Sequence, residues 1–352
     1  MAGAILTQQF QSLVKAANRI LVTSHISPDP DAVCSVLLMG RTLQANFPDK
    51  QIQMVLEENT SQDLSFLGGY SEIKFAPVFE AASDFKPDLV VIVDGNSLAR
   101  VSRNKTDELS KLIHEHLKSK VAVIDHHPDD GSFQGDIYIN EGKSSTAQQI
   151  YELCFEQLDF QKPEGYAKTA LLGILRDTSR FKYDNPDYKN TFRIVSQLIE
   201  AGASIEQLEF RLNRFTKDEL VVLAHLLENA TDNGKGYTYS FIDDQFAKDW
   251  QSDVKPDMDL KAGCDIFTNQ YLRNLDNNFW GFVVYPELLS EPISYSASFR
   301  SVSGGVDVSQ IAAKLGGGGH KQAAGAKNIR AESILDAIAT IEKTISLLGL
   351  IK

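Results

Sequence analysis

The sequence predicts an α/β protein: a parallel-sheet N-terminal domain, a helical connector and a smaller α/β C-terminal domain. In the first half of the chain, short runs rich in valine and isoleucine alternate with helix-like segments, which is typical of parallel β-α-β units. Strand-like patterns return after residue 234 and lead to a final helix. A length of 352 residues also suits two domains better than one. We expect domains at 1–190 and 234–352, joined by the connector at 191–233.

The elements of the first half are predicted by apolar spacing and by unbroken apolar runs. They are a helix over 5–18, a strand over 20–25, a helix over 32–47, and strands over 52–58, 88–95 and 121–127. In a parallel sheet with helices on both faces, ligands bind beyond the carboxyl ends of the strands. Functional residues are therefore expected directly after these runs.

The second half begins with helices and then returns to strands. Ser145 and Gln148 have the spacing of a capping box ahead of a helix, and a helix over 167–181 carries Asp177 near its end. The later elements are strands over 237–242, 279–287 and 293–301, a helical segment over 306–315, four consecutive glycines and a helix over about 331–348. These elements predict the smaller C-terminal α/β domain.

Composition excludes several classes of function. The net charge of −12 argues against a duplex DNA partner, which needs an extended basic surface. The three cysteines are far apart, which argues against a disulfide framework or a thiolate zinc site. No apolar run reaches the roughly 18 residues of a membrane span. We expect a cytoplasmic protein with no membrane partner.

Acidic residues and histidines follow three of the predicted strands. The first strand ends at His25 and is followed by Asp29 and Asp31; Asp94 lies at the end of the third strand, and Asp125, His126 and His127 end the fourth. Because parallel strands end at one edge of the sheet, these side chains should meet there. Oxygen and nitrogen ligands without thiolates indicate a divalent cation such as Mn²⁺ or Mg²⁺.

Each of these residues also has a structural interpretation. Asp31 could cap the helix over 32–47, Asp94 could be a turn residue before Gly95, and Asp177 could make a local hydrogen-bonded turn with Thr178. The triplet at 125–127 is harder to explain in this way, because two adjacent histidines after an aspartate rarely serve packing.

The glycine run is the second strong signal. Gly316, Gly317, Gly318 and Gly319 exceed the one glycine that a helix end needs, and suit a backbone that approaches a ligand with its N–H groups exposed. His320 follows at once, and Arg300 lies on the preceding strand. Together they predict an anion pocket; the alternative is a flexible linker, although linkers usually mix glycine with serine.

These motifs together resemble the DHH family of phosphoesterases, over nearly the whole chain. HISPDPDA, VDG, IDHH and GILRDTSRF resemble the four N-terminal motifs in order, and FRS with GGGGHKQAAG resembles the associated DHHA1 domain. The size and domain pairing are most similar to the nanoRNase and pAp phosphatase group. One departure is Cys34, which stands where the family pattern has glycine; it puts rate and substrate fit in doubt.

The resemblance implies a centre of two Mn²⁺ ions, with Mg²⁺ or Co²⁺ as alternatives. Its ligands would be His25, Asp29 and Asp94 for one ion, and Asp31, Asp94, His126 and Asp177 for the other. Asp94 would bridge the ions, His127 would face the substrate phosphate, and Asp125 would orient the imidazoles. Two such ions, roughly 3.5–4 Å apart, can share a hydroxide for in-line attack on phosphorus.

The resemblance also implies the substrates and partners. They are short single-stranded RNA and adenosine 3′,5′-bisphosphate (pAp), held by Arg300, the glycine run and His320. The alternatives are a cyclic di-AMP phosphodiesterase and a nucleotide-binding regulator without catalysis. The oligomeric state stays open, with a homodimer among the options.

Overall fold

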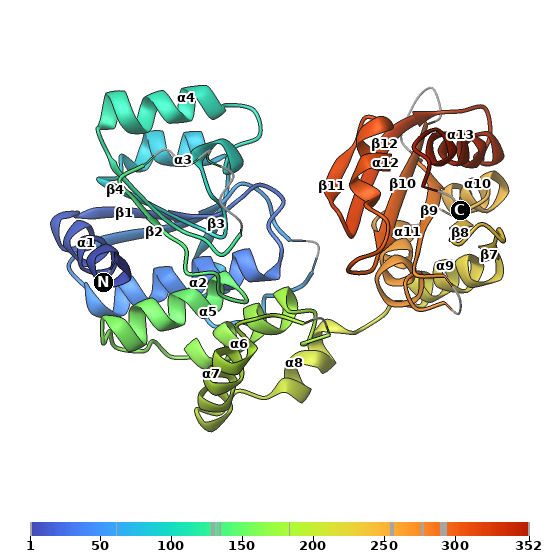
Figure 1. Cartoon of the computed structure of the whole chain (residues 1–352). Helices are drawn as coiled ribbons and strands as arrows, with labels where there is room; N and C mark the ends of the chain where they lie inside the picture. The colour runs from blue at the N-terminus through green and yellow to red at the C-terminus, as the bar shows by residue number, and fades with distance from the viewer. Residues whose placement is uncertain are drawn as a thin grey trace. The chain divides into compact units, whose positions relative to one another are not determined.

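The computed structural model describes residues 2–60, 62–127, 131, 133, 135–182, 184–253, 257–275, 278–288 and 294–350. The chain divides into two compact units, 1–213 and 214–352 (Figure 1). The segment 191–233, expected as a connector, is divided between the two units. No helix among the described residues has both the length and the apolar character that crossing a membrane requires.

The first unit is built on a six-stranded parallel sheet with the order β3-β2-β1-β4-β5-β6. Its strands are β1 (Arg19–Thr23), β2 (Gln51–Leu56), β3 (Ile73–Phe75), β4 (Leu89–Val93), β5 (Lys120–Ile124) and β6 (Ile137–Ile139). The α/β class and the parallel sheet are confirmed. The strands β3 and β6 were not predicted, because three residues are too few to show a pattern.

Helices cover both faces of this sheet (Figure 1). On one face lie α1 (Ala2–Ala16), α2 (Pro30–Asn46) and α5 (Thr146–Tyr151); on the other lie α3 (Val78–Phe85) and α4 (Thr106–Lys111). Alternation along β1 decides the faces: Ile20 and Val22 pack with the first group and Leu21 with the second. Buried strands of this kind can be apolar throughout, and all five residues of β4 are buried.

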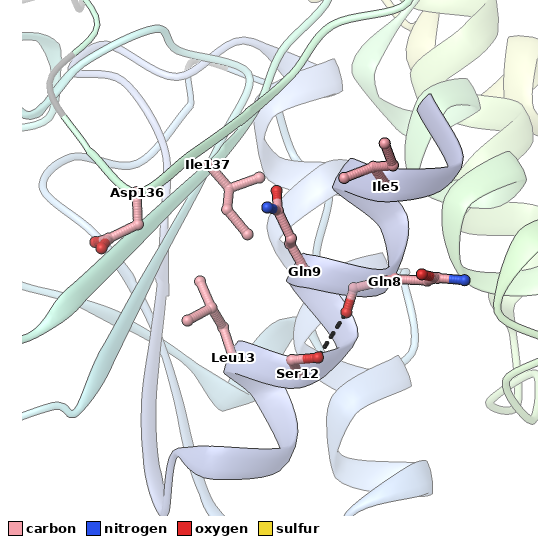
Figure 2. Close-up of a pocket in the computed structure, with 7 residues that line it drawn as sticks. All are labelled: Ile5, Gln8, Gln9, Ser12, Leu13, Asp136 and Ile137. Atoms are coloured by element: carbon pink, nitrogen blue, oxygen red, sulfur yellow. Dashed lines mark hydrogen bonds between the residues drawn. The ribbon is translucent and has the colours of Figure 1, made fainter. Parts of the chain in front are cut away.

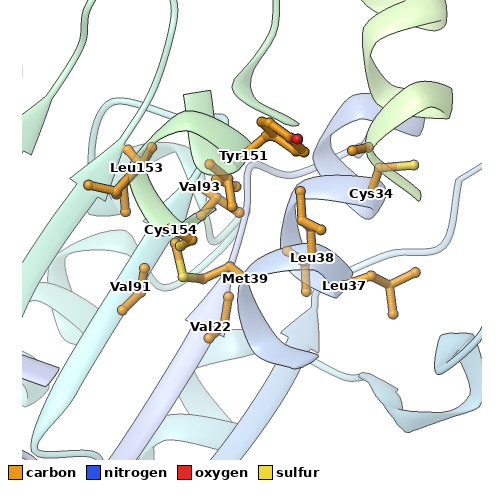
Figure 3. Close-up of a cluster of buried hydrophobic side chains, with 14 of the residues drawn as sticks. Val22, Cys34, Leu37, Leu38, Met39, Val91, Val93, Tyr151, Leu153 and Cys154 are labelled. Atoms are coloured by element: carbon orange, nitrogen blue, oxygen red, sulfur yellow. The ribbon is translucent and has the colours of Figure 1, made fainter. Parts of the chain in front are cut away.

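The larger core lies between one face of this sheet and the helices α1, α2 and α5. Figure 3 shows Val22, Val91 and Val93 of the sheet packed against Leu38 and Met39 of α2. Three further helices complete the unit: α6 (Tyr166–Asp177), α7 (Tyr188–Glu200) and α8 (Ile205–Leu212). The predicted helix over 167–181 ends earlier, at Asp177, because the chain then turns through three left-handed residues.

The second unit has its own six-stranded sheet, with the order β11-β12-β10-β9-β8-β7. The strands are β7 (Thr231–Asp232), β8 (Thr238–Phe241), β9 (Trp280–Pro286), β10 (Ser294–Ser301), β11 (Gly318–His320) and β12 (Ala323–Arg330). The helices are α9 (Lys217–Glu228), α10 (Asp244–Ser252), α11 (Asp257–Ile266), α12 (Val308–Lys314) and α13 (Ile334–Leu347). Strand β9 supplies Phe282 and Val284 to one core and Val283 to the other, so both faces are covered.

A carboxylate at the end of β9 holds this sheet to the turn in β12. Glu287 accepts hydrogen bonds from the hydroxyls of Ser294 (2.8 Å) and Ser296 (2.7 Å) and from the backbone N–H of Asn328 (3.0 Å). Burial acts to raise the pKa of Glu287, but these hydrogen bonds outweigh it and hold the pKa below its usual value.

Replacing Glu287 by glutamine should therefore lower the free energy of unfolding by on the order of 1 kcal/mol at pH 7. A lowered folded-state pKa gives stability that is present above the unfolded pKa, about 4.3, and is lost as the pH falls through the folded value. The difference between variant and parent should thus shrink in urea unfolding at pH values below 4. Exposed Glu332→Gln is the control; a deficit for Glu287→Gln that persists undiminished at low pH would contradict this account.

Candidate metal centre

The strands β1, β4 and β5 are neighbours in the sheet, so the residues that follow them meet at one edge. His25 follows β1, Asp94 directly follows β4, and Asp125 directly follows β5. Asp94 has a left-handed backbone (φ 56°), a conformation that aspartate tolerates better than most residues. The tight turn after β4 is what keeps its carboxylate at the sheet edge, where it is 2% exposed.

The start of α2 supplies two more carboxylates. Asp29, not Asp31, is the N-cap: its Oδ1 accepts from the N–H groups of Asp31 (2.8 Å) and Ala32 (3.0 Å). Pro30 occupies the first helical position, where its missing N–H costs nothing. The cap therefore fixes Asp29, and leaves Asp31 buried in the first turn.

All six residues expected as metal ligands come together. Ligand atoms lie within 4.8 Å of one another in each of three groups: His25, Asp29 and Asp94; Asp31, His126 and Asp177; and Asp94, His126 and His127. His126 Nε2 lies 3.1 Å from Asp177 Oδ2 and 3.7 Å from Asp94 Oδ1. Asp94 and His126 each belong to two groups, so both lie at the centre of the cluster.

Hydrogen bonds fix the orientation of the imidazoles. Nδ1 of His25 lies 2.7 Å from the carbonyl of Ile26, and Nδ1 of His126 lies 3.3 Å from that of Lys143. A carbonyl only accepts, so each Nδ1 carries a proton, and Nε2 faces the carboxylates, where it can give its lone pair to a cation. Nδ1 of His127 lies 2.8 Å from Oδ1 of Asp125.

The carboxyl groups of the cluster lie so close together that the ionisation of one makes the ionisation of the next less favourable. Burial, then the charges of Asp94 and Asp177, raise the pKa of Asp31 well above its usual value. Burial likewise raises the pKa of Asp177 to about 7. In contrast, contacts with His25 and His126 outweigh burial at Asp94 and lower its pKa. A divalent cation would relieve this crowding.

The donors fit such a cation. Among the described residues His126 Nε2 is buried and makes no hydrogen bond, although Asp177 Oδ2 lies 3.1 Å away. The nearby thiol of Cys34 is fully buried, and burial raises its pKa well above the usual value, so it stays protonated. Oxygen and imidazole ligands without thiolate suit hard divalent cations.

The residues expected to bind substrate lie together in the second unit. Arg300 of β10 pairs with Ala323 of β12, and Ala323 pairs with His320 of β11. Directly opposed residues share a face of the sheet, so Arg300 and His320 lie in one row, two strands apart. Arg300 Nε donates to Asn269 Oδ1 at 3.0 Å, which holds its guanidinium.

The glycine run forms part of this sheet rather than a loop. Gly318 and Gly319 belong to β11, an edge strand whose residues are exposed. A Cβ at Gly317 would lie 2.1 Å from the carbonyl oxygen of Gly325, and a Cβ at Gly319 would lie 2.6 Å from that of Ala323. Close approach to β12 therefore requires glycine at both positions, which also argues against a flexible linker.

Comparison with known proteins divides the chain in the same way. The DHH family, N-terminal domain, matches residues 19–174, and the DHHA1 domain matches residues 261–347. The chain carries a DHH family N-terminal domain and a DHHA1 domain. The resemblance predicted from the motifs is confirmed, and the metal-site cluster lies on the DHH unit, with Arg300 and the glycine run on the DHHA1 unit.

The relatives of this DHH protein include named enzymes. A bifunctional oligoribonuclease and PAP phosphatase NrnA of Mycoplasma pneumoniae is 26% identical over 95% of both chains. The cyclic-di-AMP phosphodiesterase PdeA of Listeria monocytogenes is 28% identical over 90% of this chain but only 46% of its own. The crystal structure of an exopolyphosphatase-related protein from Bacteroides fragilis has the same fold, with a TM-score of 0.79 and 20% identity over 97% of this chain and 96% of its own.

Three positions of the DHH domain that support the cluster were not predicted. The N–H groups of Thr146 and Ala147 donate to Asp31 at 2.8 and 3.2 Å, and the Thr146 hydroxyl donates to Asp94 Oδ1 at 2.9 Å. Gly173 of α6 faces Asp31 so closely that no side chain fits. Thr146 directly follows the capping serine expected from the sequence, which was the one available signal.

Replacing Thr146 by valine should lower kcat roughly tenfold or more, in line with the 10–100-fold cost of removing a group that orients a metal ligand. Valine keeps the shape and the N–H bond to Asp31 but removes the donor to Asp94. Initial rates of substrate hydrolysis measure the effect. Thr146→Ser should restore most of the rate; equal rates for valine and threonine would show that the hydroxyl does not position Asp94.

A hollow of about 440 Å³ lies elsewhere on the DHH domain, between α1 and β6 (Figure 2). It is lined by Ile5, Gln8, Gln9, Ser12, Leu13, Asp136 and Ile137. Its one carboxylate, Asp136, already contacts Lys120 at 2.7 Å and accepts from the N–H of Val121. No residue of the metal-site cluster lines this hollow, so it is separate from the centre.

Proposed function

We propose that this DHH protein is a metal-dependent phosphoesterase that hydrolyses short oligoribonucleotides, the 3′-phosphate of pAp, or both. The observation that carries the proposal is the placement of Asp94 in two adjacent groups of ligand atoms, because one buried carboxylate there can serve two cations. Relatives named as oligoribonuclease and PAP phosphatase, aligned over nearly the whole chain, support this substrate class.

In the proposed mechanism the chain's residues hold cations and position the phosphate. His25, Asp29 and Asp94 would hold one Mn²⁺, and Asp31, Asp94, His126 and Asp177 the other. Cations there would supply Lewis-acid catalysis and an activated nucleophile. Asp125 holds Nδ1 of His127, which leaves Nε2 as the ring nitrogen that can contact a phosphoryl oxygen.

The DHHA1 domain would hold the remote part of the substrate. Arg300 and His320 share a row on one face of the sheet, and the exposed edge strand β11 offers backbone groups without side chains. A guanidinium, an imidazole and free N–H groups are suitable donors for a phosphate or a nucleotide. We propose that this row selects among substrates, whereas the metal-site cluster performs the hydrolysis.

The proposal is tested by incubating the pure protein with Mn²⁺ and equal amounts of pAp, a diribonucleotide, cyclic di-AMP and pyrophosphate. Initial rates should be highest for pAp or the diribonucleotide, and EDTA should abolish them. Replacing Mn²⁺ by Mg²⁺ or Co²⁺ in the same assay tests the choice of cation. Turnover of pyrophosphate alone, or binding without turnover of all four compounds, would refute the proposal.

A second candidate function is cyclic di-AMP hydrolysis. It is favoured by the 28% identity to PdeA of Listeria monocytogenes. The match covers 90% of this chain but less than half of that protein, whereas the NrnA relatives match along nearly their whole length. The same panel separates the two candidates, because a rate on cyclic di-AMP above that on pAp and the diribonucleotide would favour the second.

A further inference from the structure

Arg176 is a largely buried cation beside the metal-site cluster. It lies in the last turn of α6, one residue before Asp177. Its Nε is buried, and no described residue accepts a hydrogen bond from it. Among the described residues the guanidinium makes no ion pair within 4.0 Å, whereas most buried charged groups are paired. Within the described part of the chain, no carboxylate therefore lies at ion-pair distance from this arginine.

The charged groups that act on Arg176 are Arg180, Glu209 and Asp29. Of these, Asp29 belongs to the expected metal ligands on the His25 side of the cluster. His127 is grouped instead with Asp94 and His126. Arg176 and His127 thus neighbour different carboxylates of the cluster, Asp29 and Asp94 respectively.

Glu209 of α8 is not the missing partner, because a second arginine already holds it. Arg180 Nε lies 2.7 Å from Glu209 Oε2, and the Arg180 guanidinium also donates to Asn213 Oδ1 at 2.6 Å. Asn213 in turn contacts the same carboxylate. Both contacts use Oε2, and Glu209 Oε1 is buried without a hydrogen-bond partner among the described residues. Glu209 and Asp29 therefore act on Arg176 only at a distance, and neither is bonded to its guanidinium.

The backbone after Asp177 fixes this arrangement. Ser179, Arg180 and Phe181 are three consecutive residues with positive φ (49°, 62° and 62°), a left-handed turn that is unfavourable for residues other than glycine. The N–H of Arg180 donates to the carbonyl of Leu175 at 2.7 Å, which closes the turn. The turn carries Arg180 to α8, and Arg176 stays on the helix beside the cluster.

We infer that Arg176 binds a second phosphate of the substrate, one that is not hydrolysed. The inference rests on the proposed function and names a feature of its substrates: pAp and short oligonucleotides carry more than the reacting phosphate. A guanidinium presents paired donors that match a phosphate, and it keeps its charge in partly buried surroundings. The reacting phosphate would lie at the cations with His127, and the second would extend to the Asp29 side.

Two structural roles compete with this inference. Arg176 could serve solely to offset the negative charge of the cluster carboxylates, or it could stabilise α8 through Glu209. Charge balance would affect all substrates alike, because the cluster serves each of them. Support of α8 would make Glu209→Gln as damaging as the loss of Arg176. Both roles are distinguishable from phosphate binding by comparing substrates that differ in one phosphate.

The test uses the full chain with Arg176→Met, which removes the charge but keeps the stem, and Arg176→Lys, which keeps the charge. Arg180→Met and Glu209→Gln are matched controls, and thermal unfolding checks that each variant folds. Rates with Mn²⁺ are measured on pAp and on adenosine 3′-monophosphate, which lacks only the second phosphate. Isothermal titration with the same two nucleotides in EDTA measures binding without turnover.

We expect Arg176→Met to raise KM and Kd for pAp tenfold or more, with kcat changed less than about twofold, since a hydrogen bond to a charged group is worth on the order of tenfold to a hundredfold. Adenosine 3′-monophosphate should be unaffected, Arg176→Lys intermediate, and both controls near the parent. Equal losses on the two nucleotides, no loss, or no measurable binding of pAp by the parent would overturn the inference. A parent that binds pAp through Arg176 but hydrolyses neither these two nucleotides nor a diribonucleotide would refute the proposed function alone.

Discussion

Replacing Asp94 by asparagine should lower kcat/KM for the preferred phosphoester by about a thousandfold or more. The substitution removes a charge from the centre of the metal-site cluster, where one carboxylate contacts His25, His126 and the Thr146 hydroxyl. Losing a group that stabilises developing charge in an enclosed site costs on the order of 10²–10³ in rate, and Asp94 is placed to serve two cations.

Asparagine is the informative replacement because it preserves the backbone. Asp94 is left-handed, and asparagine accepts that conformation while alanine would be strained. The variant should therefore fold like the parent, as circular dichroism and thermal unfolding can check. The control is Asp136→Asn. The Asp136 carboxylate pairs with Lys120 outside the cluster, so the rate of this variant should match that of the parent. A fast, EDTA-resistant Asp94→Asn protein would exclude the proposed mechanism.

Replacing Gly173 by alanine should destabilise the protein by about 1–3 kcal/mol and remove most of its activity. The added Cβ would lie 2.4 Å from Asp31 Oδ1, 2.5 Å from the Ala147 side chain and 3.3 Å from Cys34 Cβ. None of these is the far end of a flexible side chain, so α6 must move or Asp31 must turn away. Urea unfolding and initial rates on the same preparation measure the two effects.

Gly40→Ala is the matched control for this substitution. Gly40 also lies inside a helix, and its added Cβ would meet only the side chain of Met54, which is flexible. Its effect should be confined to stability, with the specific activity of the folded protein unchanged. If Gly40→Ala and Gly173→Ala lowered specific activity equally, the contact between Gly173 and Asp31 would not be the cause of the lost activity.

The sequence predicted that these side chains cluster because they lie at the ends of strands whose apolar patterns are clear. A buried parallel strand such as β4 is apolar over five residues, and the polar residue that follows it is fixed at the sheet edge. Strands β3, β6 and β11 were not predicted, because three residues, or a run of glycines, cannot show an alternating apolar pattern. Tertiary pairing, rather than local preference, makes them strands.

The supporting contacts of the site could not be predicted in the same way. Gly173 of α6 lies against Asp31 of α2 where the two helices pack together. Arg176 is distinguished by an Nε that has no hydrogen-bond partner among the described residues. The row of Arg300 and His320 depends on the register of β12, a strand whose small residues gave no signal. Such features follow from which residues become neighbours, and spacing along the chain does not contain that information.

The bond between Asp31 and the start of α5 also makes the centre observable without any catalysis. The amide hydrogens of Thr146 and Ala147 are held by a carboxylate that is 115 and 116 positions away in the chain. Their exchange with solvent deuterium therefore depends on the docking of α2 against α5, and not on hydrogen bonds within α5 itself. Hydrogen exchange at these two backbone amides thus reports how often α2 and α5 separate at the metal-site cluster.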